Sequence, residues 1–347
     1  MVVSGSAPIR IAVFGAGRIG QVHIDNLSKR VEGVSVSAIV DVRHDAAIAL
    51  ASKYGVPVAT GDVDAVLGDR DIDAVLIASA TDTHSALIRG AAATGKHIFC
   101  EKPIDTTIEA IDESLAAVER AGVRFQVGFN RRFDPSFRRV HDLVRSGEAG
   151  KPHLIRITSR DPQPPPAGYF TGDLGIFPDM TIHDFDLARF LMGAAEAEDE
   201  VVQVFATGAS LVSNMDGGSG EMDTAVSVLT FASGAIATID NSRRAVYGYD
   251  QRIEVFGSGG MVAAGNVNAD SHVVSNATGI RSAVPHFFFL ERYAVSYANE
   301  LVAFIQAVKS GTATPVTGHD GRMAVVIATA AQQSVRLARP VRIGEVV

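Results

Sequence analysis

The stretch IRIAVFGAGRIGQVHIDNL, residues 9–27, indicates how the first half of the chain folds. Its opening residues, 9–14, are mostly apolar, as in a strand that is buried on both faces of a parallel sheet. Gly15, Gly17 and Gly20 follow as G-x-G-x-x-G, and a helical pattern comes next. In such a motif the first glycine permits a tight turn, the second lets backbone approach a pyrophosphate, and the third lets helix and strand pack closely. The strand–turn–helix context therefore predicts a dinucleotide-binding site.

An acidic residue stands where this motif requires one. A second apolar segment over residues 34–41 ends in Asp41, 21 residues after Gly20. A carboxylate at this distance is expected to bind the adenosine ribose hydroxyls, and the alternative is an aspartate that caps the next helix. The acid favours NAD because it would repel the 2′-phosphate of NADP. Arg18 and Arg43 nearby leave NADP as the second choice.

The following segments alternate between strand and helix patterns. Strands are predicted over 73–79, 97–101 and 124–129, and helices over 82–95 and 106–122. This alternation predicts a doubly wound parallel sheet of the Rossmann type with right-handed crossovers. Ligands of such sheets bind beyond the carboxyl ends of the strands.

Three segments should lie at that edge of the sheet: ASATDTH (78–84), EKP (101–103) and NRRF (130–133). Pro103 disfavours a helical conformation for Lys102 and should hold it pointing into the cleft, although a solvated surface lysine is the alternative. Cys100 is interpreted as buried filler. The candidate cofactor-binding residues are Gly15, Gly17, Arg18, Ile19, Gly20, Asp41, Val42, Arg43, Ser79, Thr81, His84, Glu101 and Lys102.

The pattern changes after about residue 128 and predicts a second domain. Helices are expected over 135–147, 179–190, 292–311 and 318–338, and strands over 152–160, 201–211, 223–243 (a hairpin turning at 233–234), 251–265 and 341–344. Long antiparallel strands after β–α units indicate an α+β domain with an open, mostly antiparallel sheet covered by helices on one face. The expected domains are 1–128, binding NAD, and 129–347, binding substrate and forming oligomers. The uncovered sheet face predicts a homo-oligomer, a tetramer or a dimer. Residues 214–223 should form an exposed loop.

Composition narrows the classes of partner. The chain has 347 residues, 47% of them hydrophobic, and it is too long for a single hydrophobic core. This length also favours two domains. The net charge of −8 argues against nucleic acid and anionic membranes, which attract basic surfaces. A single cysteine suits a reducing cytoplasm. No signal peptide or transmembrane run of about 18 apolar residues is found. We therefore expect a soluble cytoplasmic protein.

The stretch DMTIHDFDLARF, residues 179–190, combines core and polar positions. Asp179 and His183 are at i and i+4, so they project from one face of a helix. The carboxylate could orient the imidazole, and histidine is the best candidate general base near neutral pH. With Lys102 these groups would form an alcohol-oxidation site beside a nicotinamide. The alternative is a structural histidine with a capping aspartate. The sequence places no further histidine or carboxylate to complete a metal site, and no bound metal is expected.

These motifs together resemble one family. GAGRIG (15–20), EKP (101–103), GFNRRFD (128–134) and DMTIHDFDLARF (179–190) are similar to those of the glucose–fructose oxidoreductase, inositol dehydrogenase and rhizopine-catabolism family. Within it, the segments 247–261 and 288–301 resemble the inositol 2-dehydrogenase branch. The resemblance covers the whole chain and implies a Rossmann domain followed by an open-sheet α+β domain.

The resemblance also implies an activity. It assigns a catalytic triad to Lys102, Asp179 and His183, and it suggests that Arg131, Asp161 and Tyr249 lie near a cyclic polyol. The expected reaction is NAD-dependent oxidation of a secondary alcohol, with myo-inositol giving 2-keto-inositol. Asn130 and the stretch 159–162 depart from the pattern of myo-inositol enzymes, so scyllo-inositol or an aldopyranose such as glucose stays open. A non-catalytic NAD-binding regulator is the alternative of another class.

Overall fold

The opening stretch forms a strand, a glycine turn and a helix. These are β1 (Ile9–Phe14) and α1 (Arg18–Lys29) in a computed structural model that describes residues 7–165, 175–193, 199–212 and 222–346. Within the described residues the chain divides into two units, one made of 1–133 and 295–323 and the other of 134–294 and 324–347.

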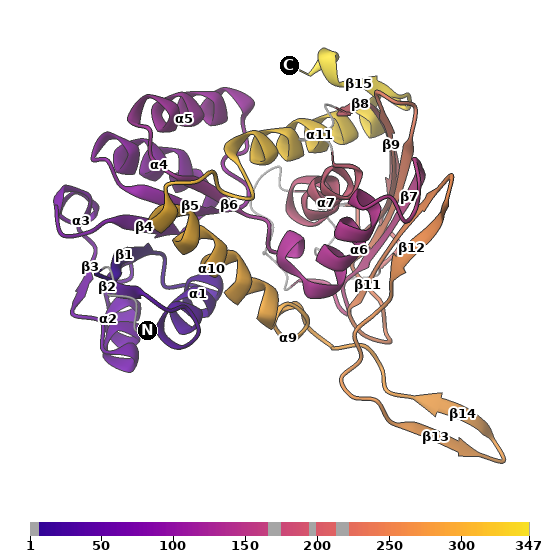
Figure 1. Cartoon of the computed structure of the whole chain (residues 1–347), viewed down its shortest axis with the longest axis horizontal. Coiled ribbons are helices and arrows are strands. Elements are labelled where there is room, and N and C mark those ends of the chain that lie inside the picture. The colour runs from indigo at the N-terminus through magenta and orange to yellow at the C-terminus, as the bar shows by residue number, and fades with distance from the viewer. Residues whose placement is uncertain (1–6, 166–174, 194–198, 213–221, 347) are drawn as a thin grey trace. The chain divides into compact units, whose positions relative to one another are not determined.

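The first unit is built on a six-stranded sheet whose paired strands all run parallel (Figure 1). The strand order is β3-β2-β1-β4-β5-β6, which places a topological switch point between β1 and β4. The strands after β1 are β2 (Val34–Val40), β3 (Val58–Thr60), β4 (Ala74–Ile77), β5 (His97–Glu101) and β6 (Phe125–Gly128). The helices between them are α2 (His44–Tyr54), α3 (Val63–Gly68), α4 (His84–Ala93) and α5 (Ile108–Ala121). The predicted Rossmann sheet is confirmed.

A helix from late in the chain completes the core of this unit. Leu301, Phe304 and Ile305 of α10 (Ala294–Ser310) pack in one hydrophobic cluster with Ile11 and Val13 of β1. Because this helix covers the sheet beside α1, residues 295–323 belong structurally to the first unit, whereas we expected all of 129–347 to form the second. The assignment of substrate binding and assembly to 129–347 stays a prediction.

The second unit contains a seven-stranded sheet with the order β12-β11-β7-β10-β9-β8-β15. Among the strands that the structure describes in this sheet, β7 and β10 form the one parallel pair. Its strands are β7 (Pro152–Arg160), β8 (Val201–Ala209), β9 (Thr224–Phe231), β10 (Ile236–Ser242), β11 (Asp250–Gly257), β12 (Gly260–Ala264) and β15 (Val341–Arg342). In Figure 1, α6 (Pro135–Arg145) and α7 (Ile182–Met192) lie along one face of this sheet. The expected open sheet with helices on one face is confirmed.

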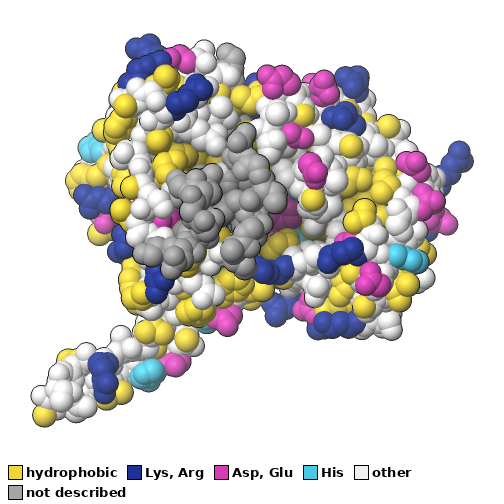
Figure 2. Space-filling model, turned by 180° about the vertical axis from the view of Figure 1, so that it is seen from behind, with side chains coloured by type: hydrophobic (Ala, Val, Ile, Leu, Met, Phe, Trp, Pro, Cys, Tyr) yellow, Lys and Arg dark blue, Asp and Glu magenta, His cyan; other side chains and the backbone are white. Residues whose placement is uncertain are grey.

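Two details of this unit differ from expectation. The segment predicted as one strand over 251–265 is a hairpin of β11 and β12. Gly257, the last residue of β11, has no room for a side chain, because a Cβ there would lie 2.4 Å from the backbone oxygen of Ala149. The strands β13 (Val273–Asn276) and β14 (Gly279–Ser282) form a further hairpin that projects from the sheet. Figure 2 shows hydrophobic, basic and histidine side chains exposed along it.

The last helix, α11 (Gly318–Leu337), belongs to the second unit from Ala324 onward. None of the helices within the described ranges is both long and apolar enough to cross a membrane. Most of the predicted loop over 214–223 lies outside the described residues.

Candidate active site

The glycine motif forms a turn with room beside its middle glycine. Gly15 has φ +106°, and a Cβ there would lie 2.4 Å from the backbone oxygen of Ala78. A Cβ on Gly20 would lie 1.9 Å from the backbone oxygen of Gly15, so these two glycines are required by the packing of the turn itself. Gly17 has no neighbour within 4 Å of such a Cβ. It is the N-cap of α1 without any side-chain cap, so the space beside it suits an anionic pyrophosphate at the helix N-terminus.

Asp41 lies directly after β2 and faces the glycine turn. Its Oδ2 accepts a hydrogen bond from the Ala16 backbone N–H at 2.6 Å, and its Oδ1 accepts one from the Arg43 N–H at 2.8 Å. The N-cap of α2 is Arg43, so Asp41 does not cap that helix. Val42 between them is 97% exposed. The acid predicted to bind the ribose is thus held at the carboxyl edge of the sheet, close to the pyrophosphate turn.

The segment after β4 is tied to the EKP turn by a histidine. His84 is buried, and its Nδ1 lies 2.8 Å from the carbonyl oxygen of Pro103. Burial lowers the pKa of His84, so the neutral ring donates from Nδ1 to this carbonyl, and its Nε2 lies farther, 3.2 Å, from the carbonyl oxygen of Ser79. Thr81 begins a short 3-10 helix. The contacts of His84 support the turn from within, whereas Ser79 and Thr81 lie at the surface near it.

The EKP turn itself ends β5. The Lys102 backbone N–H donates to Glu101 Oε2 at 3.3 Å, Lys102 is half-buried, and its peptide bond to Pro103 is cis. Cys100 is fully buried and burial raises the pKa of its thiol, which agrees with its interpretation as filler. Lys102 is thus held at the carboxyl end of a buried strand, as the sequence predicted.

In the second unit, Asp179 and His183 lie on one nearly continuous helix. A π-helical turn over Phe177–Thr181 runs into α7, and such turns are frequent at functional sites. The neighbouring Met180, Ile182 and Phe185 are buried as predicted, while Asp179 and His183 are half-buried. The helix is buried almost all round, its polar Asp184, Asp186 and Arg189 included, so Asp179 and His183 stand out as partly accessible polar positions.

An amide from β10 fixes this helix to the sheet. Asn241 Oδ1 accepts from the Thr181 hydroxyl at 2.8 Å, and its Nδ2 donates to Asp184 Oδ2 at 2.8 Å. Both contacts are buried, where a hydrogen bond is costly to lose. Asn241 thus sets the rotation of the helix and with it the direction of the 179–183 face.

An arginine that the sequence analysis did not single out joins two predicted site residues. Arg243 donates from one terminal nitrogen to Asp179 Oδ2 at 2.7 Å and from the other to Asp161 Oδ2 at 3.3 Å. Its side chain is 5% exposed; burial lowers the pKa of Arg243, but the two carboxylates outweigh this and raise it overall. No signal in a single sequence could have found it, because the cause is a pairing of distant strands. Asp161 follows β7 and Arg243 follows β10, and these two strands are parallel neighbours.

The other two predicted substrate residues lie in different units. Tyr249 is buried in the second unit, its N–H donates to the His286 carbonyl at 2.9 Å, and its ring lies edge-on to Tyr293 with centroids 5.9 Å apart. Arg131 is buried in the 3-10 turn after β6, in the first unit. The structure therefore brings Asp161 and Asp179 together, and the meeting of Lys102 and Arg131 with the second unit's residues stays a prediction.

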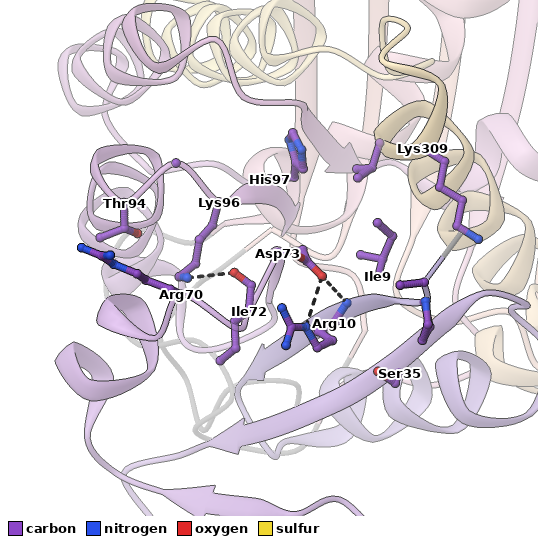
Figure 3. A pocket seen from close by; sticks show the side chains of 14 residues that line it. Ile9, Arg10, Ser35, Arg70, Ile72, Asp73, Thr94, Lys96, His97 and Lys309 are labelled. Atoms are coloured by element: carbon purple, nitrogen blue, oxygen red, sulfur yellow. Dashed lines mark hydrogen bonds and ion pairs between the residues drawn. The ribbon is translucent and has the colours of Figure 1, made fainter. Parts of the chain in front are cut away.

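A hollow in the first unit lies at the opposite edge of the sheet from the glycine turn (Figure 3). It is lined by residues at the starts of β1, β4 and β5. Its polar groups form ion pairs and hydrogen bonds that stabilise the fold. Arg10 pairs with Asp73, and Lys96 Nζ donates to the carbonyl oxygens of Ile72 and Asp69 at 2.9 and 2.5 Å. Because parallel sheets bind ligands at their carboxyl edge, we place the cofactor at the glycine turn and not in this hollow.

The glycine turn, the acid after β2 and the strand order are those of a dinucleotide-binding Rossmann unit. A family model described as "Oxidoreductase family, NAD-binding Rossmann fold" matches residues 9–129, and one for the GFO/IDH/MocA C-terminal domain matches residues 137–263. The chain belongs to this glucose–fructose oxidoreductase, inositol dehydrogenase and rhizopine-catabolism family. The resemblance noted from the motifs is confirmed.

Relatives cover nearly the whole chain. A myo-inositol 2-dehydrogenase of Thermotoga maritima is 48% identical over 98% of this chain and 100% of its own length. An inositol 2-dehydrogenase of Rhizobium meliloti is 45% identical over 96% of this chain and 99% of its own length.

Solved structures agree with these relatives. A probable dehydrogenase from Thermotoga maritima superposes with a TM-score of 0.93 at 48% identity, covering 97% of this chain and all of that one. A myo-inositol dehydrogenase from Lactobacillus casei, solved with NAD(H) and myo-inositol, gives a TM-score of 0.88 at 27% identity, with 96% of both chains covered.

Proposed function

We propose that this protein is an NAD-dependent dehydrogenase that oxidises one secondary alcohol of a cyclic polyol, with myo-inositol converted to 2-keto-inositol. The observation that carries the proposal is the pair Asp179 and His183, half-buried at i and i+4 on a helix that is otherwise almost entirely buried. The relatives described above, inositol dehydrogenases that are 45–48% identical to this chain, support the substrate class.

The proposed chemistry divides between three side chains. His183 takes the proton of the substrate hydroxyl, and Asp179 stabilises the imidazolium that forms. Lys102 donates a hydrogen bond to the same oxygen, favouring the negative charge that develops there as the carbon–oxygen bond becomes a carbonyl. NAD, when bound, supplies the acceptor for the hydride that leaves the carbon. The products are a ketone, a protonated histidine and the reduced cofactor.

Arg243 fits this scheme as the partner of both carboxylates. Because it pairs with Asp161 and Asp179, it holds the two carboxylates together, and carboxylate oxygens accept hydrogen bonds from substrate hydroxyls. Adjacent ring hydroxyls present donors to such a pair of acceptors. A polyol therefore suits this cluster better than a substrate that carries its own negative charge.

The cofactor is held by the first unit. We assign the pyrophosphate to the turn at Gly17 and the adenosine ribose to Asp41, with Arg18, Ile19, Val42 and Arg43 beside them. Ser79, Thr81, Glu101 and Lys102 line the nicotinamide side. The acid at the ribose makes NAD the preferred cofactor over NADP.

We also propose that the protein acts in the cytoplasm as a homo-oligomer, a tetramer or a dimer, assembled through the outer face of the second unit's sheet. On that face, Phe205, Val226, Ile236 and Phe256 are all at least 39% exposed although they lie in regular strands. Apolar side chains on an uncovered sheet face are typical of an interface. Ion pairs on the same face, such as Arg156 with Glu254, would give such an interface its register.

A substrate panel tests the proposed activity. Purified protein is incubated with myo-inositol, scyllo-inositol, glucose and open-chain polyols, each with NAD or NADP, and absorbance of the reduced cofactor is followed. We expect the highest kcat/KM for myo-inositol with NAD. Preference for scyllo-inositol or glucose would correct the substrate within the same mechanism. NAD binding without turnover of any compound would favour the regulator.

A further inference from the structure

Inside the first unit, two ionisable side chains that the proposed chemistry does not use meet Glu101. His23 of α1, Glu101 of β5 and Glu300 of α10 each place a nitrogen or oxygen within 4.8 Å of the other two. His23 and Glu300 are 0% exposed, and the Glu101 side chain is 12% exposed. The cluster lies at the carboxyl end of β5, one residue before Lys102.

The contacts within the cluster are unequal. His23 Nε2 lies 2.6 Å from Glu101 Oε1, while Glu101 Oε2 accepts the backbone N–H of Lys102. Neither carboxyl oxygen of Glu300 has a hydrogen-bond partner among the described residues. Gly128 leaves room for the Glu101 carboxyl group, since a Cβ there would lie 3.1 Å from it. Glu101 is therefore held at both oxygens, and Glu300 is buried beside it with no partner of its own.

The charges around Glu300 decide whether its carboxyl group is protonated. The groups that face it are His23 on α1 and Glu101 on β5, while β6 contributes the uncharged Gln126, whose amide donates to the Glu300 backbone oxygen at 2.8 Å. On α10 itself Tyr297 lies one turn earlier, its ring edge-on to His23. The basic side chain of this cluster is thus a histidine that already hydrogen-bonds another carboxylate. A second buried negative charge there would be strongly unfavourable.

A proton explains this arrangement better than a metal ion. The His23–Glu101 distance of 2.6 Å is that of a hydrogen bond, and adjacent ligands of an octahedral ion with bonds of about 2.1 Å are separated by about 3 Å. Burial, and then the Glu101 charge, raise the pKa of Glu300 well above its ordinary value. Both points favour a neutral carboxylic acid.

We propose that Glu300 is a positioning residue for Lys102: it stays a neutral carboxylic acid, so that Glu101 remains a single carboxylate that binds His23 and the Lys102 backbone. Ionisation of Glu300 would set two carboxylates against each other and displace Glu101 from the turn that aims Lys102. This inference rests on the proposed function only for the role of Lys102. The protonation of Glu300 stands on its own geometry.

Infrared spectroscopy of the full-length protein at neutral pH tests the proton directly. The wild type should show the carbonyl stretch of a buried protonated carboxylic acid, and Glu300→Gln, which has the same shape and no charge, should lack it. Ser296→Ala, a substitution of another fully buried side chain one turn earlier on α10, serves as the matched control and should keep the band.

The pH dependence of stability gives a second readout without substrate. The folded pKa of Glu300 lies above that of the unfolded chain, so between the two the native state binds the extra proton and loses stability as pH rises. Glu300→Gln removes this loss. The Tm of the variant relative to the wild type should therefore increase as pH rises above the unfolded pKa, until Glu300 ionises in the folded protein, while the Ser296→Ala difference stays constant.

The pH profile of turnover tests the link to Lys102. We expect Glu300→Gln to keep kcat/KM within about threefold of the wild type at neutral pH and to extend activity to higher pH, because it has no proton to lose. Wild-type and Glu300→Gln protein with the same alkaline limb would overturn the positioning role.

Two results would overturn the protonation of Glu300 itself. One is the absence of the infrared band together with equal Tm slopes. The other is a stoichiometric metal ion, found by elemental analysis of the purified protein and lost in Glu300→Gln, which would replace the proton with a cation. If the band is present but no polyol is oxidised, the proposed function fails and the protonation of Glu300 is upheld.

Discussion

His183 is the residue on which the proposed chemistry depends most. Its position beside Asp179 makes it the base, and general acid–base catalysis contributes roughly 10²–10⁴-fold to rate. We therefore expect His183→Ala to lower kcat by about that factor. Affinity for NAD should hardly change, because the nucleotide is held by the first unit. Oxidation by the wild type should speed up as pH rises and the imidazole loses its proton, and this dependence should disappear in the variant.

Two controls define the result for His183. Asp179→Asn should cost less than His183→Ala, since the amide still occupies the space beside Arg243 while losing the charge. Lys102→Ala should be severe. A folded, NAD-binding His183→Ala protein with near-normal turnover would leave His183 as an ordinary structural histidine.

Asp41 should decide which cofactor the protein uses. Its carboxylate is fixed by the Ala16 and Arg43 backbone N–H groups, where it would repel a 2′-phosphate. We expect kcat/KM to favour NAD over NADP by at least about tenfold, or about 1.4 kcal/mol, and Asp41→Ser to erode this preference. The control Asp45→Ser changes an exposed acid in the first turn of α2 and should preserve it. Equal use of both cofactors by the wild type would remove Asp41 as the discriminator.

At the level of elements, the turn between β1 and α1 contains one glycine that should be needed for folding and another that should be needed for NAD binding. An alanine at Gly20 would place its Cβ 1.9 Å from the Gly15 backbone oxygen, so Gly20→Ala should lower the unfolding temperature strongly or prevent folding. An alanine at Gly17 meets nothing in the chain, so Gly17→Ala should fold normally. It should lose NAD affinity by tenfold or more, because the added methyl occupies the space assigned to the pyrophosphate.

Thermal unfolding and calorimetric NAD titration of both variants check this pair. Tight NAD binding by Gly17→Ala would place the pyrophosphate elsewhere. A stable Gly20→Ala protein would mean that α1 shifts to accommodate the methyl group.

The same turn shows why local elements were predictable. Gly15, Gly17, Gly20 and Asp41 act through neighbours close in sequence, so their spacing predicts both the strand–helix unit and the cofactor. The strands of the second sheet were also predictable where one face is buried, because alternation then appears in the sequence. The β13–β14 hairpin is exposed on all sides of both strands, so it carries no such alternation and was missed.

Contacts between distant segments could not be predicted in this way. Helix α10 was expected, yet nothing in residues 294–310 shows that Leu301 and Phe304 pack against β1, almost three hundred residues earlier. Arg243 is similar. Its pairing with Asp161 and Asp179 depends on β7 and β10 being parallel neighbours, a pairing that a single sequence does not specify.

On the scale of the whole molecule, the second unit's sheet carries the proposed assembly. Its inner face is covered by helices of the same chain, whereas the outer face leaves Val226 44% exposed in β9. A charge at this position is compatible with the isolated fold, because the Val226 side chain is exposed and the carboxylate of Asp240, which pairs with Arg160, lies directly opposite on β10. In a symmetric interface a lysine introduced at this position would be buried, or would face its own copy.

We therefore expect Val226→Lys to convert the wild-type oligomer to a smaller species with its secondary structure intact. Light scattering after size-exclusion chromatography measures the mass, and circular dichroism checks the fold. Ile48→Lys is the matched control, because Ile48 is 50% exposed on α2 of the first unit and should have no effect on mass. If Val226→Lys keeps the wild-type mass, the outer sheet face is not the interface. A wild type that is monomeric at micromolar concentration would contradict assembly altogether, and the exposed apolar face would then need another explanation.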